Sequence, residues 1–198
     1  MMSLAMLMPR RHVLAASAII PIMSSPLKGG QAVAVSLTYA AGRLSWPGGE
    51  TRAACGRAGV RADKQEGDGA SPEGIFPLLY GFYRADRIAQ PASGLRMTAL
   101  HPDDGWVDDP KDSHYNRLVK LPYAASHETM WMAEPLYDLV VVIGYNTDPV
   151  VPGRGSAIFL HVAREDFAPT AGCVAIERNT LAALLGLLGP GSTITIRA

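Results

Sequence analysis

The amino-acid sequence predicts a domain built mainly of β-strands. Its 198 residues include 20 glycines and 15 prolines, a composition that favours short elements and many turns over long helices. Apolar runs rich in β-branched residues recur, the clearest being Tyr-Asp-Leu-Val-Val-Val-Ile at 137–143. One stretch, 177–188, has apolar residues at a helical period. We therefore expect a mainly β fold with short helices.

Charge and cysteine content exclude several classes of protein. The 18 basic and 18 acidic residues give a net charge of zero, without a block of like charge, which argues against a nucleic-acid-binding protein. The two cysteines, Cys55 and Cys173, do not form a CxxC pair, and the five histidines lack HxxxH or HExxH spacing. A zinc site is therefore not expected, and nothing in the sequence suggests another metal or a cofactor.

Residues 1–34 are interpreted as a secretion signal. A basic region at Arg10 and Arg11 precedes the apolar stretch 13–23, and Ala32-Val33-Ala34 matches an A-x-A cleavage pattern. The two arginines followed by His-Val-Leu are similar to a twin-arginine export signal. We expect cleavage before residue 35 and a mature domain of residues 35–198.

Two alternatives exist for this N-terminal stretch. An uncleaved signal anchor is one, although the apolar run is too short to span a bilayer as a stable helix. A buried N-terminal helix is the other, and it would need polar residues at a helical period, which the stretch lacks.

The first half of the mature chain predicts short strands joined by turns. Strands at 34–38 and 43–46 flank Tyr-Ala-Ala-Gly, and Pro-Gly-Gly then turns the chain into a third strand at 51–56. Four glycines, a proline at position 72 and mixed charges at 59–77 predict an exposed loop. That loop is either a solvated connector or functional, and it leads into a strand at 75–80.

The middle of the chain, 84–132, is expected to be irregular. Aromatic residues alternate there with prolines, three histidines and two Asp-Asp pairs. The pairs Asp103-Asp104 and Asp108-Asp109 lack metal-ligand spacing, so we interpret them as part of a solvated turn around Pro110. The histidines, His101, His114 and His127, are expected to be structural or exposed.

Regular structure returns at 137–143, which reads as a strand buried on both faces. A second apolar strand is expected at 157–162, followed by the helix at 177–188, which Gly-Pro-Gly ends. Alternation at 192–197 predicts a closing strand.

His161 lies at the end of the predicted strand 157–162, and Cys173 follows twelve positions later, directly after Thr-Ala-Gly. A polar turn between them would let the imidazole meet the thiol, the minimum arrangement for a thiolate nucleophile. The histidine would act as base for the attack and as acid for the leaving amine. The amides of Gly172 and Cys173 are the expected oxyanion hole, and Thr170 would bond within the loop or touch substrate.

Two other readings of Cys173 exist. A cysteine after glycine is often a buried small hydrophobic residue. In an exported protein, Cys173 could also pair with Cys55 in a structural disulfide. An export signal, an unpaired cysteine and a histidine that ends the preceding strand together favour a reactive thiol.

These residues resemble the L,D-transpeptidase (YkuD) catalytic domain family. Leu160-His161 followed by Thr-Ala-Gly-Cys-Val at 170–174 is similar to its active-site signature, a His followed at a distance by Ser/Thr-His-Gly-Cys. The stretch 69–76 resembles its Thr-Pro-x-Gly-x-Phe motif with Ser71 for Thr, and Ile-Gly-Tyr-Asn at 143–146 is similar to the segment before its catalytic strand.

The resemblance, which covers about residue 35 to the C-terminus, implies a β-sandwich with peptidoglycan stem peptides as partners. A cysteine would attack the amide between an L- and a D-centre, and an amine of another stem or water would resolve the thioester. Cys173 would be the nucleophile, His161 the general base and acid, and Gly172 with Cys173 the oxyanion amides. It also implies a periplasmic role in cell-wall biogenesis, acylation of the cysteine by carbapenems, and substrate contacts at Thr170, Tyr145 and Asn146.

Two departures from the family pattern affect the acceptor. The usual second histidine is Ala171 here, and a basic residue often found two positions after the cysteine is Ala175. These changes leave transfer and hydrolysis both open. The alternatives are an L,D-carboxypeptidase, endopeptidase or amidase that uses water, or a non-catalytic wall-binding protein with a Cys55–Cys173 disulfide.

Overall fold

The computed structural model of the protein describes residues 34–198. Except for its last residue, the predicted secretion signal lies outside the described residues, so the signal and the domain boundary after it stay predictions. Within residues 34–198, no helix is both long and apolar enough to cross a membrane.

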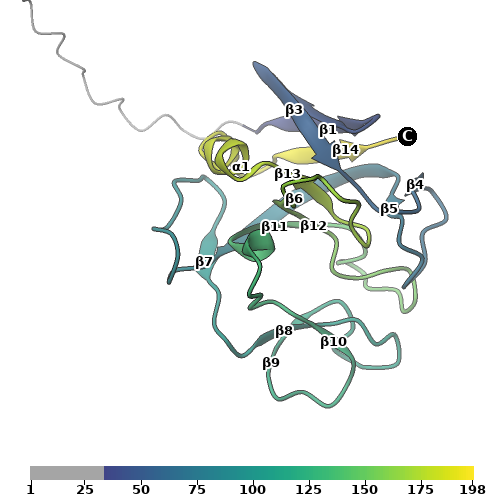
Figure 1. The fold of residues 1–198 in the computed structure, drawn as a ribbon. Coiled ribbons are helices and arrows are strands. Elements are labelled where there is room, and N and C mark those ends of the chain that lie inside the picture. The colour runs from purple at the N-terminus through teal and green to yellow at the C-terminus, as the bar shows by residue number, and fades with distance from the viewer. Residues whose placement is uncertain (1–33) are drawn as a thin grey trace, which may run out of the picture. The chain divides into compact units, whose positions relative to one another are not determined.

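The described chain forms two β-layers that are joined along both edges (Figure 1). The first layer contains β1 (Ser36–Ala40), β2 (Arg43–Trp46), β3 (Gly49–Ala54) and β14 (Thr193–Ile196). The second contains β6 (Gly74–Tyr83), β7 (Met97–Ala99), β11 (Leu139–Ile143), β12 (Phe159–Val162) and β13 (Val174–Ile176). At one edge, β3 pairs with β2 through its first four residues and with β13 through Ala53 and Ala54. At the other edge, β6 pairs with β14 through its first half and with β11 through its second half. The mainly β sandwich expected from the sequence is thereby confirmed.

Strand β11 has an apolar core on each of its faces, as its continuous run of Leu, Val and Ile predicts. Leu139, Val141 and Ile143 belong to the core between the two layers. Val140 and Val142 belong to a second core on the opposite face, which includes Phe159 and Cys173. The neighbouring strand β12 alternates in the same way, so it presents Phe159 and His161 to one face and Leu160 and Val162 to the other.

Helix α1 (Arg178–Leu185) follows β13 and buries Leu181, Leu184 and Leu185 in the core between the layers. Glu177 caps its start, because the carboxylate accepts hydrogen bonds from the first free backbone amides of the helix. The predicted helix 177–188 is correct in kind but too long, since the helix ends at Leu185, with Gly186 as its C-cap, and not at the Gly-Pro-Gly that follows.

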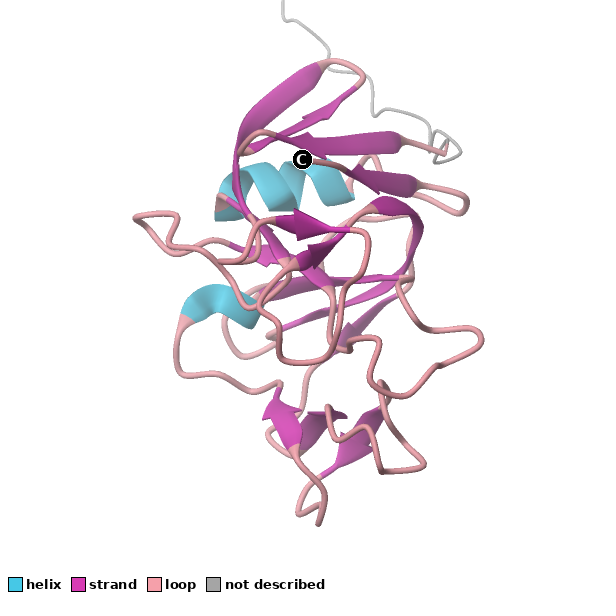
Figure 2. Ribbon diagram, turned by 90° about the vertical axis from the view of Figure 1, so that its right-hand side faces the viewer, coloured by secondary structure: helices cyan, strands magenta, loops and turns pink. Residues whose placement is uncertain are grey.

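A small three-stranded sheet packs below the sandwich, in a region expected to be irregular (Figures 1 and 2). Most of that region is irregular as expected, but the expectation missed these strands because they have only three or four residues and carry charged side chains, so they show no apolar period. Trp106 anchors the sheet: its ring packs edge-on against Phe159, with centroids 5.0 Å apart, and its indole donates to Asn116. The strands are β8 (Asp104–Val107), β9 (Leu118–Lys120) and β10 (His127–Thr129), and a one-turn 3₁₀ helix, Pro135–Tyr137, leads from them back to β11.

The segment expected to be an exposed loop at 59–77 is partly buried. Strands β4 (Val60–Arg61) and β5 (Ser71–Pro72) pair within it, and Lys64, Ala70 and Ser71 are buried. Lys64 is compensated by Asp68, 2.9 Å away. The expectation missed this because glycines and mixed charges do not reveal which side chains the loop folds inward.

Candidate active site

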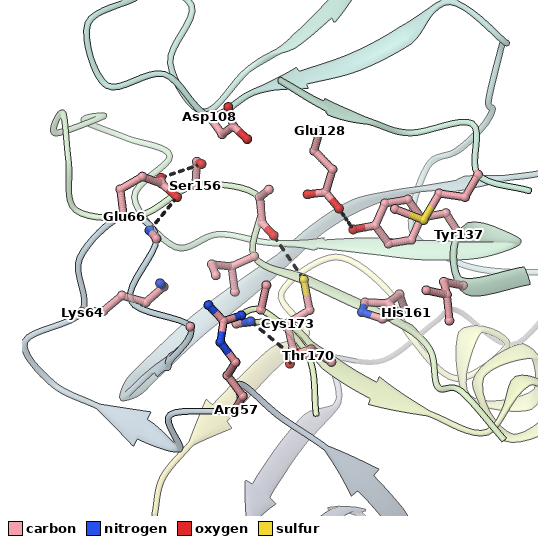
Figure 3. Close-up of a pocket in the computed structure, with 18 of the residues that line it drawn as sticks. Arg57, Lys64, Glu66, Asp108, Glu128, Tyr137, Ser156, His161, Thr170 and Cys173 are labelled. Atoms are coloured by element: carbon pink, nitrogen blue, oxygen red, sulfur yellow. Dashed lines mark hydrogen bonds between the residues drawn. The ribbon is translucent and has the colours of Figure 1, made fainter. Parts of the chain in front are cut away.

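The parallel pairing of β12 with β13 brings His161 and Cys173 to one pocket. Leu160 lies opposite Val174 and His161 opposite Ala175, so Cys173, one residue before β13, lies beside Phe159. His161 and Phe159 share a face of β12 because side chains alternate along a strand. Cys173 and His161 therefore lie next to each other on the wall of a pocket of about 300 Å³ (Figure 3).

The Cys173 thiol is buried and engaged by the backbone of the segment that leads into β12. Its Sγ accepts a hydrogen bond from the Phe159 N–H at 3.3 Å and donates to the Ala157 carbonyl at 3.2 Å. Burial raises the pKa of the thiol well above its ordinary value, and the negative charge of Glu128 raises it further. In the free protein, Cys173 is therefore a neutral thiol at pH 7.

The imidazole of His161 is held by a backbone carbonyl and an aromatic ring. Its Nδ1 lies 2.9 Å from the carbonyl oxygen of Val162. Because a carbonyl only accepts, we assign the proton to Nδ1, which leaves Nε2 free to take another. The ring of Tyr137 packs edge-on against the imidazole at 5.3 Å, and burial lowers the pKa of His161 to about 4.

The resting site thus pairs a neutral thiol with a neutral imidazole. The arrangement suits general-base catalysis, in which the proton moves from sulfur to Nε2 only as sulfur attacks. The Val162 carbonyl orients the ring, as a carboxylate does in other nucleophile–histidine systems.

The turn before Cys173 is organised by Thr170. Its hydroxyl donates to the Cys173 carbonyl at 2.7 Å and accepts from the Gly172 N–H at 3.1 Å. The Gly172 amide, predicted to belong to the oxyanion hole, is thus engaged within the turn in the resting structure. It would have to leave Thr170 to bind an oxyanion, and Thr170 acts here on the loop.

Position 172 requires glycine for two reasons, the lack of room for a Cβ and the positive φ of its backbone. Its φ is +154°, and a Cβ at this position would lie 2.8 Å from the carbonyl oxygen of Ala70. The Ser71 hydroxyl donates to the Gly172 carbonyl at 2.7 Å and accepts from the Gly56 N–H at 3.0 Å. Ser71 therefore links the partly buried 59–77 segment, the end of β3 and the cysteine turn.

Two residues predicted to touch substrate do not line this pocket. The Tyr145 hydroxyl donates to the Arg154 carbonyl, and the Asn146 side chain bonds to the backbone of Val151 and Gly155. Both belong to a separate hollow next to Phe76. These polar groups bond within their own loop, and the expected contacts of Tyr145 and Asn146 with substrate stay a prediction.

The two cysteines are not bonded to each other. Cys55 and Cys173 are both free thiols, so the disulfide considered as an alternative is not formed. None of His101, His114 or His127 lines the pocket. Within residues 34–198, no group of three or more His, Cys, Asp or Glu side chains is placed to hold a metal ion.

Charged residues missed by sequence reasoning make up much of the remaining wall. Arg57, Lys64 and Glu66 come from the stretch between β3 and β5, Asp108 directly follows β8, and Glu128 lies in β10 (Figure 3). Asp108 was expected in a solvated turn, and Asp104, expected there too, is buried. The expectation failed because the packing of the small sheet turns these carboxylates inward, which no local pattern reveals.

Comparisons with known proteins give one result. The family model described as the L,D-transpeptidase catalytic domain (YkuD) matches residues 32–196. The match extends from before β1 to the end of β14 and includes the whole pocket. Neither the curated proteins nor the solved structures gave a match.

Proposed function

The chain belongs to the YkuD family of L,D-transpeptidase catalytic domains, and on that premise we propose that it is a periplasmic enzyme that cross-links peptidoglycan stem peptides through a thioester on Cys173. The observation that carries the proposal is the placement of Cys173 beside a neutral, carbonyl-oriented His161 in one pocket. Export by the signal at 1–34 is part of the same proposal.

Acylation begins with a donor stem in the pocket. Sulfur attacks the amide carbonyl between the L- and D-centres, and the thiol proton moves to Nε2 of His161 as the C–S bond forms. The Cys173 N–H and, once released from Thr170, the Gly172 N–H are the donors for the developing oxyanion. His161 then returns the proton to the leaving amine, which departs with the terminal D-residue and leaves a thioester.

The thioester is resolved by the amine of a second stem. The new amide is a 3→3 cross-link or one that uses another stem position as donor. With water as acceptor, the same thioester would give a trimmed monomer, the product of an L,D-carboxypeptidase, endopeptidase or amidase. At position 171 the exposed alanine offers no polar group to the thioester, so acceptor choice depends on other parts of the pocket.

The decisive experiment is muropeptide analysis after incubation with purified tetrapeptide-bearing peptidoglycan fragments. We expect dimers with wild type and neither dimers nor trimmed monomers with Cys173→Ala. Cys55→Ala is the matched control, and it should retain activity because Cys55 lies outside the pocket. Products formed by folded Cys173→Ala at the wild-type rate would refute the mechanism.

A further inference from the structure

The pocket around Cys173 holds more negative charge than its basic residues neutralise. Glu66, Asp108 and Glu128 line it, and none of them takes part in a salt bridge within the described part of the chain. Of the three Lys and Arg residues that line the pocket, Lys64 is paired with Asp68 and Arg164 with Glu134, so Arg57 alone is left to offset three carboxylates. Unpaired carboxylates that are partly removed from water are costly, which points to a cationic ligand.

Glu128 is the carboxylate next to the reactive sulfur. One of its oxygens, Oε1, accepts a hydrogen bond from the Tyr137 hydroxyl, and Tyr137 packs against His161 (Figure 3). The other oxygen, Oε2, has no hydrogen-bond donor among residues 34–198. The charge of Glu128 acts directly on the Cys173 thiol. Glu128 is therefore fixed in orientation, with one acceptor atom left for a ligand.

Asp108 is a second carboxylate in the pocket with an acceptor oxygen that lacks a hydrogen-bond donor. Its Oδ1 is buried and has no hydrogen-bond partner, the one such side-chain atom found in the described residues. A buried oxygen without a partner costs about 1–3 kcal/mol, so such atoms commonly mark the place of a ligand or water. Asp108 lies on the same wall as Glu128, opposite the strand that carries His161.

We propose that Glu128, assisted by Asp108, binds the primary ammonium group of the acceptor substrate and removes its first proton. The inference rests on the proposed function, because it assigns the acceptor to the thioester of Cys173. It also supplies what Ala171 lacks: a polar group that distinguishes an amine from water.

The proton balance of the transfer step uses both walls of the pocket. The ammonium gives one proton to Glu128, and the free amine attacks the thioester carbonyl, forming the C–N bond. A second proton passes to Nε2 of His161, the C–S bond breaks, and the departing sulfur receives that proton. Glu128 then releases its proton to solvent, so one amide, one thiol and one proton are formed.

The surroundings of Glu128 suit this exchange. Tyr137, Asp108, Glu66 and Cys173 are the titratable groups that face it. Burial, together with the charges of Asp108 and Glu66, raises the pKa of Glu128 to about 7. A carboxyl group with that pKa can both hold a proton and lose it near neutral pH.

The test compares Glu128→Gln with Glu73→Gln, an exposed control outside the pocket. Glutamine keeps an oxygen for Tyr137 but replaces the charge and the second acceptor oxygen by an NH2 group, which cannot bind an ammonium. Transfer is assayed with a tetrapeptide donor and a stem-peptide acceptor, and acylation separately with a carbapenem, which brings no acceptor amine. We expect the KM for the acceptor to rise about 10- to 100-fold, the loss of one charged hydrogen bond, and the ratio of hydrolysis to transfer to rise with it.

The carbapenem acylation rate should stay within a few-fold of wild type, and Asp108→Asn should weaken acceptor binding in the same direction. Two results would overturn the inference: an unchanged acceptor KM in folded Glu128→Gln, or an acylation rate that falls in parallel with transfer. Both are separate from failure of the proposed function, which would appear as activity in Cys173→Ala. Thermal unfolding of each variant shows whether it is folded. If Glu128→Gln is not folded, the acceptor KM of Asp108→Asn alone tests the inference.

Discussion

The two walls of the pocket are built on different principles. The wall with Cys173 and His161 is made by two adjacent parallel strands, and its reactive groups are oriented by backbone carbonyls and amides. The opposite wall, with Asp108 and Glu128, comes from the small sheet and is oriented by side chains, above all the hydroxyl of Tyr137. Backbone pairing gives the first wall a fixed geometry, whereas the second depends on tertiary packing.

Burial shifts the pKa of one residue on each wall, and the two shifts have opposite directions but the same cause. It lowers the pKa of His161 to about 4 and raises that of Glu128 to about 7, because in both cases it disfavours the charged form. The imidazole and the thiol are thus both uncharged in the resting site, and proton transfer is coupled to the arrival of substrate.

The largest effect is expected from His161→Ala. Loss of the group that takes the thiol proton should lower kcat/KM for acylation by about 10²- to 10⁴-fold, the usual contribution of a general base. The rate of carbapenem acylation, followed by intact-protein mass spectrometry, measures this step without an acceptor.

His101→Ala is the matched control, since His101 is exposed and outside the pocket. It should acylate at the wild-type rate. An acylation rate within threefold of wild type in a folded His161→Ala variant, a range of about 0.7 kcal/mol, would mean that the thiol loses its proton by another route.

A smaller but still large effect is expected from Gly172→Ala, which tests the geometry of the backbone-built wall. The added methyl would meet the Ala70 carbonyl at 2.8 Å, and alanine is strained at a φ of +154°. We expect a loss of unfolding free energy on the order of 3 kcal/mol and slower acylation, because the turn must move Cys173 to relieve the contact.

Gly153→Ala is the control that shows how much of the loss comes from backbone strain and how much from the contact with Ala70; both variants are measured by urea unfolding. Gly153 also has a positive φ, +78°, but a Cβ there would have open space around it. It should cost about 1 kcal/mol, for backbone strain alone, and leave acylation unchanged. Equal losses in the two variants would show that the Ala70 contact is unimportant.

The backbone-built wall could be predicted from the sequence because its parts are near one another in the chain. A strand that ends in His161, a polar turn and Gly172-Cys173 can pair in only a few ways, and the apolar run at 139–143 shows its double burial directly. The chemical roles of these residues stay predictions, although their meeting in one pocket is a feature of the structure.

The opposite wall could not be predicted because its strands are too short to show a period. Glu128 lies in a strand of three residues between His127 and Thr129, and it is half-buried with its carboxylate on the Tyr137 hydroxyl. Tyr145 and Asn146 illustrate a related limit of sequence patterns: a sequence shows a polar side chain but not whether a nearby carbonyl already binds it.

The smallest expected effect is a pH dependence of stability in which the two walls oppose each other. Glu128 has a folded pKa of about 7, raised from 4.5, so its protonated form is favoured by folding. Its contribution to stability is complete below pH 4.5 and is lost as pH rises through 7. His161 has a folded pKa of about 4, lowered from 6.5, so its contribution is present above pH 6.5 and is lost as pH falls through 4.

Between pH 4.5 and 6.5 the two slopes have opposite sign and largely cancel in the wild type. Glu128→Gln removes the first slope, so its unfolding free energy should rise relative to wild type by on the order of 2 kcal/mol from pH 4.5 to 7. For His161→Gln the unfolding free energy relative to wild type should change in the opposite direction, so it should fall as pH rises from 4 to 6.5. Urea unfolding at a series of pH values measures both pH dependences. A loss of packing in a variant lowers its unfolding free energy equally at every pH, so it does not change the slope. Parallel curves for wild type and Glu128→Gln would mean that the Glu128 carboxylate is well solvated, and the opposite wall would then lack the strained charge that an acceptor ammonium is inferred to relieve.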